Sequence, residues 1–550
     1  MSYETVFMRR VWKQRRILIG KWARQRKSHL VFLAVFALIG ASIGVWLQVP
    51  ALAAVEAESS ERFSAADDLT TYGYSDAHEN FNPAETNITA LTARHLKQKW
   101  AHKTGDGVTD QPVLATIGNA TIVYWGSWDG YLHATNVSNN QMVWATFLGQ
   151  TSDGSCDPPI AGVSSSPTVT TINGKLEVLV GGGDANLYAL DATTGKILWK
   201  TPFPGSSPSA YIWSSPTVYN GSIYIGSASF GDCPLIQGQL LQLDAISGRL
   251  IHQFDTVPNG CTGGGVWSTP TIDEAAGTVY ITTGNPSKCT AGIYSPAMVE
   301  LDAADVSHLL GYWQVPKKQQ NGDSDFGTTA TLFQETINGV VTNMVGAANK
   351  NGIYYAFNRA NIGAGPIWEV RVAVNGECPQ CGDGSVSSSA WDGHTLYIGG
   401  GRTTINGKNC QGSLHAINPN SITGVSTSAS ATPTVTATAT APTPTSTSGA
   451  TPTASTVPNA TVNFLWQHCM QAGPVIGSVM VAGATAGTEV VAASQGPTVI
   501  VMNAVTGKTL ARLTDHKHGS LLYAPPTITD GMLFIGNLDG NLYAYSINGA

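Results

Sequence analysis

A pattern of about 50 residues recurs eight times after residue 110, and it constrains the fold more than any other feature of this sequence. The clearest copy contains SSPTV at 165–169 and NLYALDATTGKILWK at 186–200. The other copies begin near residues 111, 214, 268, 327, 388, 473 and 524. Within each copy, short β-branched and aromatic runs alternate apolar and polar residues, a TG-type turn follows, and the last run tends to end in Trp. Each copy therefore predicts four short strands.

Repeats of this length with four antiparallel strands are typical of propeller blades, which bury their faces against neighbouring blades. The last copy lacks a fourth strand, while residues 96–103 supply an extra strand before the first copy. We therefore predict an all-β, eight-bladed propeller over 96–550, closed by both ends of the chain. A seven-bladed ring with one repeat unformed is the alternative. The Trp residues that recur at blade ends are expected to pack between blades: Trp144, Trp199, Trp313, Trp368 and Trp466.

One segment interrupts the repeats. Residues 421–462 consist largely of Ser, Thr, Ala and Pro and carry no charge. Such a composition does not form a packed core, and it predicts an extended loop inserted in the sixth blade. The loop is either an O-glycosylated, mucin-like element or a neutral solvated spacer.

The first 95 residues indicate a targeting segment and a lead-in. Residues 1–29 contain nine Lys and Arg, and residues 30–49 are an uncharged, mostly apolar run. A helix over this run would be about 30 Å long, the thickness of a bilayer core. The basic flank stays in the cytoplasm, so residues beyond 50 lie outside. Ala51 and Ala53 also have the form of a signal-peptidase site. We therefore expect either a transmembrane anchor with the propeller outside the cytoplasm, or secretion after cleavage, with 50–95 as a linker.

Charge excludes one class of partner. Beyond residue 29 the chain has 20 Lys and Arg against 35 Asp and Glu. Binding to phosphate backbones needs clustered basic side chains. We therefore expect the propeller to bind no nucleic acid.

All eight cysteines lie beyond residue 150, on the predicted outer side, where thiols are oxidised into stable bridges. We predict a Cys233–Cys261 disulfide, because these residues flank loops at one face of adjacent blades. The second predicted pair is Cys378–Cys381; a redox or zinc pair is the alternative. The spacing leaves the other four cysteines unassigned.

Four residues of consecutive blades are predicted to meet near the axis. The start of a blade's first strand and the end of its antiparallel second strand lie on the same face. Trp267 directly precedes the first strand of the fourth copy, and Asp325 precedes that of the fifth. Asn285 and Lys350 follow the second strands of the same copies. We therefore expect these four side chains on one face of the propeller.

The units NLYALDATTGKILWK, GQLLQLDAISGRL and GNLYAYSINGA resemble the repeat of the pyrroloquinoline quinone (PQQ)-type propeller family, which includes quinoprotein alcohol dehydrogenases. The resemblance covers residues 96–550. It implies PQQ and Ca²⁺ as cofactors. It implies Asp325 as the catalytic base, Asn285 as a calcium ligand, Lys350 at the quinone carbonyls and Trp267 beneath the quinone ring.

The sequence departs from the dehydrogenase pattern at two places. No Glu stands at the end of the third blade's second strand, where Asp232 is near but shifted; Asp232 is therefore a second candidate metal ligand. The vicinal Cys–Cys pair is also missing, and only Cys156 lies in that region. The predicted activity is oxidation of an alcohol or sugar-like substrate by hydride transfer to PQQ, with electrons leaving to an external acceptor, because the chain has no CxxCH motif. The alternative is a non-catalytic scaffold that retains the architecture and binds a protein partner at the cell envelope.

Overall fold

The computed structural model describes residues 68–203, 209–285, 289, 293–424, 460–515 and 519–550. All of these residues belong to one compact unit. The described residues form strands, short 3₁₀ helices and loops, and contain no α-helix.

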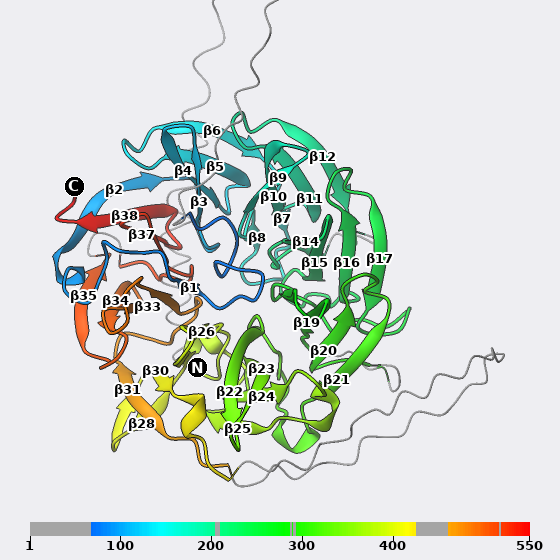
Figure 1. The fold of residues 1–550 in the computed structure, drawn as a ribbon. Helices are drawn as coiled ribbons and strands as arrows, with labels where there is room; N and C mark the ends of the chain where they lie inside the picture. Colours follow the sequence, from blue (N-terminus) through cyan, green and yellow to red (C-terminus); the bar gives the residue numbers. More distant parts are fainter. Residues whose placement is uncertain (1–67, 204–208, 286–288, 290–292, 425–459, 516–518) are drawn as a thin grey trace, which may run out of the picture. The chain divides into compact units, whose positions relative to one another are not determined.

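Eight four-stranded antiparallel sheets follow one another around a ring (Figure 1), so the predicted eight-bladed propeller is confirmed. Blades one to four, each given from its inner to its outer strand, are β3 (Val113–Ile117), β4 (Ala120–Gly126), β5 (Tyr131–Asn136) and β6 (Met142–Phe147); β9 (Thr168–Ile172), β10 (Lys175–Gly181), β11 (Asn186–Asp191) and β12 (Ile197–Pro202); β14 (Thr217–Tyr219), β15 (Ser222–Ser229), β16 (Gln239–Asp244) and β17 (Leu250–Asp255); β18 (Thr271–Asp273), β19 (Thr278–Thr282), β20 (Ala297–Asp302) and β21 (Leu309–Gln314).

Blades five to eight have the same layout. Their strands are β22 (Thr331–Ile337), β23 (Val340–Ala348), β24 (Ile353–Asn358) and β25 (Trp368–Arg371); β26 (Ala390–Trp391), β27 (Leu396–Gly400), β30 (Gly412–Ile417) and β31 (Phe464–Met470); β32 (Met480–Ala482), β33 (Val490–Gln495), β34 (Thr498–Asn503) and β35 (Thr509–Thr514); β36 (Thr527–Thr529), β37 (Met532–Gly536), β38 (Asn541–Ile547) and β2 (Leu96–Lys103).

Short elements complete the described chain. They are β1 (Phe81–Asn82), β7 (Thr151–Ser152), β8 (Ile160–Ala161), β13 (Ala210–Tyr211), β28 (Thr403–Ile405), β29 (Lys408–Cys410), η1 (Ala93–His95), η2 (Lys317–Gln319), η3 (Ile362–Ala364), η4 (Pro379–Cys381) and η5 (Pro419–Ser421).

The ends of the chain close the ring as predicted. Strand β2 pairs antiparallel with β38, with Leu96 opposite Ile547 and Lys103 opposite Asn541. The last blade therefore takes three strands from the C-terminal end and one from residues 96–103.

The inner strands begin with a recurring Ser-Pro-Thr or Thr-Pro-Thr motif, and the last Thr of this motif explains why it recurs. Its buried hydroxyl donates to a backbone carbonyl of the next blade: Thr168 to Pro216 at 2.6 Å, Thr217 to Pro270 at 2.7 Å, and Thr271 to Ala330 at 2.6 Å. These bonds join successive inner strands around the axis.

The blade-end Trp residues and the TG turns form a second contact between blades. Trp144 packs on Gly195 of the next blade, and its indole N–H donates to the Ala192 carbonyl at 2.9 Å. A Cβ on Gly195 would lie 2.5 Å from the indole, and the residue has φ +68°. Trp466 meets Gly507 in the same way. The turn therefore needs Gly for its backbone conformation and to make room for Trp.

Residues 69–82, which we call the rim segment, run inside the ring along the innermost strands (Figure 1). The carbonyls of the rim segment accept hydrogen bonds from the inner strands of blades one, two, four, five, six and seven, in that order along the segment. The donors are the amides of Leu114, Val169, Ile272, Leu332, Trp391 and Val481. Strand β1 also pairs in parallel with β32. The rim segment lies before the predicted start of the propeller at 96, yet it contacts six blades through backbone hydrogen bonds.

In the sequence, the predicted insertion falls between two strands of the sixth blade, β30, which ends at Ile417, and β31, which begins at Phe464. Residues 425–459 of the insertion lie outside the described residues, as does the helix predicted for 30–49. No helix in the described part of the chain is long and apolar enough to cross a membrane.

The disulfide prediction was half right. Cys378 and Cys381 are bonded, but Cys233 pairs with Cys156 and Cys261 with Cys289, so the predicted Cys233–Cys261 bridge is wrong. The loop that carries Cys233 packs against the loop after blade one, where Cys156 lies close to Trp128 and Phe230. The fourth bond joins Cys410 to Cys469, and no cysteine of the described chain is free.

Candidate functional site

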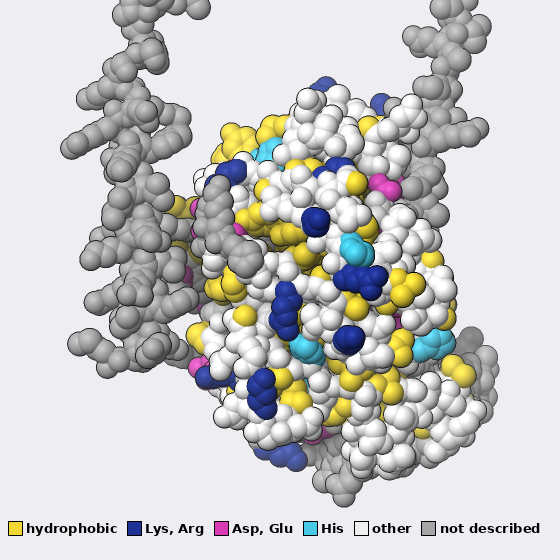
Figure 2. Space-filling model, turned by 90° about the vertical axis from the view of Figure 1, so that its left-hand side faces the viewer, with side chains coloured by type: hydrophobic (Ala, Val, Ile, Leu, Met, Phe, Trp, Pro, Cys, Tyr) yellow, Lys and Arg dark blue, Asp and Glu magenta, His cyan; other side chains and the backbone are white. Residues whose placement is uncertain are grey.

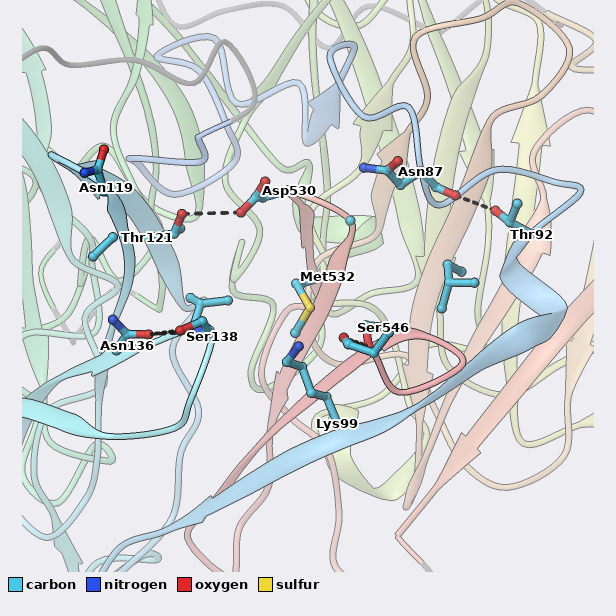
Figure 3. A pocket seen from close by; sticks show the side chains of 15 residues that line it. Asn87, Thr92, Lys99, Asn119, Thr121, Asn136, Ser138, Asp530, Met532 and Ser546 are labelled. Atoms are coloured by element: carbon cyan, nitrogen blue, oxygen red, sulfur yellow. Dashed lines mark hydrogen bonds between the residues drawn. The ribbon is translucent and has the colours of Figure 1, made fainter.

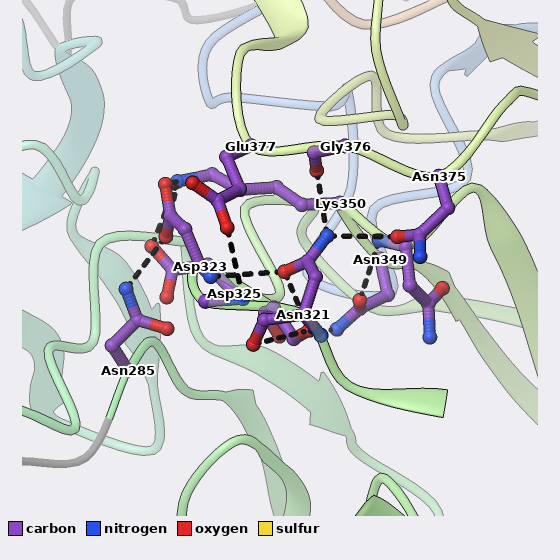
Figure 4. A network of polar contacts seen from close by, with 12 residues as sticks. Asn285, Asn321, Asp323, Asp325, Asn349, Lys350, Asn375, Gly376 and Glu377 are labelled. Atoms are coloured by element: carbon purple, nitrogen blue, oxygen red, sulfur yellow. Dashed lines mark hydrogen bonds and ion pairs between the residues drawn. The ribbon is translucent and has the colours of Figure 1, made fainter. Parts of the chain in front are cut away.

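The structure brings the four predicted axial residues together. Lys350, in the loop after β23, places its Nζ 3.0 Å from Asp325 Oδ2 and 5.3 Å from the centre of the Trp267 ring. Asn285, in the loop after β19, reaches the same group through a further carboxylate (Figure 4). The site thus combines a cation, a carboxylate, an amide and an aromatic face.

The further carboxylate is Asp323, which the sequence analysis missed. Lys350 Nζ lies 2.9 Å from Asp323 Oδ2 and 3.0 Å from Oδ1, and Asn285 Nδ2 donates to Asp323 Oδ1 at 2.6 Å. Asp323 lies in a turn of the motif DSDFG, so the sequence offered no strand periodicity that would place its side chain beside that of Asp325. In the structure, Asp323 and Asp325 both face Lys350.

The loop that carries both carboxylates is held by Asn321. Its side-chain oxygen accepts from the Asp323 amide at 2.9 Å and from the Ser324 hydroxyl at 2.8 Å. The Lys350 amide donates to the Asp325 carbonyl at 3.0 Å, which ties this loop to the end of β23. The side chains that face each other are thus fixed by local hydrogen bonds.

Burial dominates the electrostatics of Asp325. Removal from water raises the pKa of Asp325 from 3.8 to about 7, against the opposing effect of the Lys350 ammonium. Burial alone would lower the pKa of Lys350, but Asp325 and Asp323 raise it above its ordinary value, so Lys350 stays protonated. Asp325 Oδ1 has no hydrogen-bond partner. This buried oxygen therefore has an unused capacity to accept a hydrogen bond or a proton.

Carboxylate oxygens of Asp232, Asp323 and Asp325 lie within 4.8 Å of one another. Hard cations such as Ca²⁺ prefer oxygen ligands of this kind. This donor set fits a calcium ion, and Asp232, predicted as a shifted ligand, lies in it.

Trp267 is half-buried and lies over Gly327. A Cβ at position 327 would stand 2.1 Å from the indole Cη2, so any side chain there would displace the ring. The indole also borders a cavity of about 140 Å³ on the propeller axis. Gly327 thus determines where the aromatic face can lie.

A larger groove lies away from this site, between blades eight and one (Figure 3). Its volume is about 600 Å³, and its lining includes Asn119, Ser138, Lys99 and Asp530 but none of the predicted site residues. On the side of the ring shown in Figure 2, Lys and Arg side chains stand apart from one another among uncharged atoms.

Comparison with known proteins supports the predicted resemblance. The family described as outer membrane protein assembly factor BamB matches residues 164–305. A polyvinylalcohol dehydrogenase from Sphingopyxis sp. is 29% identical over 227 residues, covering 34% of this chain and 34% of the relative. A second one, from Pseudomonas sp., is 25% identical over 375 residues, covering 61% and 55%. This chain therefore spans between a third and just over half the length of these two relatives.

A quinohemoprotein alcohol dehydrogenase from Comamonas testosteroni is 25% identical over 322 residues, covering 50% of this chain and 42% of the relative. Its crystal structure superposes with a TM-score of 0.65 at 18% identity, covering 88% and 81% of the two chains. A europium-containing methanol dehydrogenase gives a TM-score of 0.64 at 13% identity, covering 88% and 98%. The resemblance to the PQQ-repeat propellers and to quinoprotein alcohol dehydrogenases is confirmed, and the solved structures share the fold.

Proposed function

We propose that this protein is an alcohol dehydrogenase that uses PQQ and Ca²⁺. The observation that carries the proposal is the buried Asp325 carboxylate, whose Oδ1 has no partner and whose Oδ2 contacts Lys350 beside the half-buried Trp267. The relatives named above support this choice of chemistry.

The cofactors fit the residues present. Calcium would be held by Asp323, Asp232 and the side-chain oxygen of Asn285, with the two carboxylates replacing the Glu that this chain lacks, and Asp325 would stay free to act as the base. The quinone would rest on Trp267, with its carbonyl edge near Lys350. When bound, PQQ supplies the acceptor for the hydride of the alcohol, which carries two electrons.

Asp325 would take the hydroxyl proton of the alcohol on Oδ1. Its raised pKa makes it a stronger base than an exposed carboxylate, and bases with a pKa near the working pH are the most effective. Lys350 acts as a positioning residue, because its ammonium holds Asp325 Oδ2 and Asp323 in place. Asn285 in turn orients Asp323.

The electrons then leave to an external acceptor, because no CxxCH motif that would attach a c-type haem is present in the sequence. The four disulfides favour an oxidising compartment, in agreement with a location outside the cytoplasm.

The test is a titration of the purified chain with PQQ and CaCl₂, followed by dye reduction with a panel that includes methanol, secondary alcohols and polyvinyl alcohol. We expect micromolar quinone binding that EGTA abolishes, and turnover with at least one alcohol. Asp325→Asn should lower the rate by about 10² to 10⁴, the usual contribution of a general base. The control Asp539→Asn changes an exposed carboxylate and should leave the rate unchanged.

Absence of quinone binding in the presence of calcium would refute the proposal. The scaffold hypothesis would then be the better explanation of the retained architecture.

A further inference from the structure

The Cys378–Cys381 disulfide closes a loop that borders the candidate site but supplies none of the side chains assigned to it. This loop, residues 374–384 between β25 and β26, is called the CPQC loop below. All eight cysteines lie in the described part of the chain, and Cys381 is the one exposed residue among them. Exposed disulfides are reduced more readily than buried structural ones. The Cys378–Cys381 bond is therefore the one that a reductant reaches most easily.

The chain segment that this disulfide closes is the shortest of the four. The bond joins residues three positions apart, whereas the other three bonds join residues 77, 28 and 59 positions apart. Stabilisation by a disulfide grows with the length of chain that it closes. We therefore expect the loss of this bond to leave the propeller folded and to act locally.

The first half of the CPQC loop holds the turn that carries Asp323. Asn321 Nδ2 donates to the Gly376 carbonyl at 2.9 Å. The Gly322 amide donates to Glu377 Oε1 at 2.9 Å (Figure 4). On its other side, the Asn321 side chain accepts from the Asp323 amide at 2.9 Å. The position of the Asp323 carboxylate therefore depends on Gly376 and Glu377.

The second half of the CPQC loop is anchored on blade six. The Arg402 amide donates to the Gly382 carbonyl, and the Arg402 guanidinium pairs with Asp383. Two backbone hydrogen bonds span the turn, from the amides of Cys381 and Asp383 to the Cys378 carbonyl at 2.9 and 3.1 Å. The disulfide is the cross-link that fixes the half holding the Asp323 turn to the anchored half.

We propose that the Cys378–Cys381 bond is a thiol–disulfide exchange site through which a dithiol reductant loosens the turn that carries Asp323. A thiolate of the reductant attacks Sγ of the exposed Cys381, the Cys378–Cys381 bond breaks, and a mixed disulfide forms. The second thiol of the reductant then displaces Cys381 and closes the reductant's own disulfide. Two electrons and two protons pass from the reductant to the cysteines, which become thiols.

Reduction would affect the candidate metal site through Asn321 and Gly322. Without the cross-link, Gly376 and Glu377 hold these two residues less firmly. Groups that orient a metal ligand typically change metal affinity by about 10- to 100-fold. We therefore expect the reduced protein to bind Ca²⁺ more weakly by about this factor. This step rests on the proposed function, which assigns Asp323 as a calcium ligand.

The first test is hydrogen–deuterium exchange of the full chain without calcium. In a variant with both Cys378→Ser and Cys381→Ser, the amides of residues 321–325 should exchange faster than in the oxidised wild type. Glu377→Ala keeps the disulfide but removes the acceptor of the Gly322 amide, so it should also speed exchange there. The control Gln380→Ala changes an exposed side chain of the same loop and should match the wild type. Unchanged exchange of 321–325 in the double variant would overturn the proposal.

The second test needs no variant. The wild-type protein is titrated with dithiothreitol and its free thiols are alkylated and mapped by mass spectrometry. Cys378 and Cys381 should be alkylated at a lower concentration of dithiothreitol than the buried Cys156 and Cys410. Reduction of this pair only after the other three bonds have opened would overturn the proposal.

The third test measures Ca²⁺ binding by competition with a chromophoric chelator. Equal Ca²⁺ affinities of the wild type and the double variant would overturn the inference and leave the proposed function standing. A wild-type protein that binds no Ca²⁺ would refute the proposed function, and the exchange of 321–325 would then decide this inference alone. The two can therefore fail separately.

Discussion

Asp325→Asn should make the stability of the calcium-free protein less sensitive to rising pH. In the unfolded chain Asp325 ionises near 3.8, whereas burial delays its ionisation in the folded protein until about pH 7. The folded state therefore binds the proton more tightly between these two values. The contribution of this carboxyl to stability is fully present below pH 3.8 and is lost as the pH rises to about 7.

The size of the effect follows from the pKa difference. Each pKa unit corresponds to about 1.4 kcal/mol, so a shift of about three units gives a loss of about 4 kcal/mol. The carboxyl is almost fully buried, so solvent screening removes little of this amount. An amide at position 325 does not ionise. We therefore expect the free energy of unfolding of Asp325→Asn, relative to that of the wild type, to rise by up to about 4 kcal/mol between pH 4 and pH 8.

The assay is urea unfolding in EGTA at several pH values, with Asp539→Asn as the control for an exposed carboxyl. Over this range Lys350 stays protonated, so the change reports Asp325. A difference between Asp325→Asn and the wild type that does not vary with pH would refute the reasoning, because burial would then not dominate the titration.

Two further outcomes test the fold and the site. Thr271→Val keeps the shape of the side chain but leaves the buried Ala330 carbonyl without its donor. In chemical denaturation this variant should lose about 1–3 kcal/mol of the free energy of unfolding. Thr271→Ser, which keeps the hydroxyl, should retain most of the wild-type stability. A Cβ at position 327 would clash with the Trp267 ring, so Gly327→Ala should alter the Trp fluorescence and abolish quinone binding; Gly154→Ala, where a Cβ meets open space, should change neither.

The fold could be predicted because each of the eight repeats carries the sequence pattern of the same four-stranded blade. Each unit carries its own strands, its turn and its Trp, and no unit can bury its faces alone. The same regularity placed Trp267, Asn285, Asp325 and Lys350 on one face, since equivalent strand ends of adjacent blades meet there.

The features that the sequence analysis missed lie outside the repeat. Asp323 forms part of the site only because its loop turns both carboxylates toward Lys350, and that depends on hydrogen bonds made by Asn321. The partner of Cys233 depends on the paths of two long loops, which spacing does not determine. The rim segment has no repeat pattern, because its hydrogen bonds to the blades come mainly from its backbone.

The rim segment also imposes an order on biosynthesis. Its residues leave the ribosome before any blade has been made, yet the Asn80 carbonyl pairs with the amide of Val481, about 400 residues later. At about 5–20 residues per second, that partner emerges roughly 20 to 80 s afterwards. During this time the blades can form one after another, while the rim segment and β2 wait without their final partners. The part of the chain that is made first is therefore among the last to reach its native place, and the centre of the ring is sealed only when the circle of blades is complete.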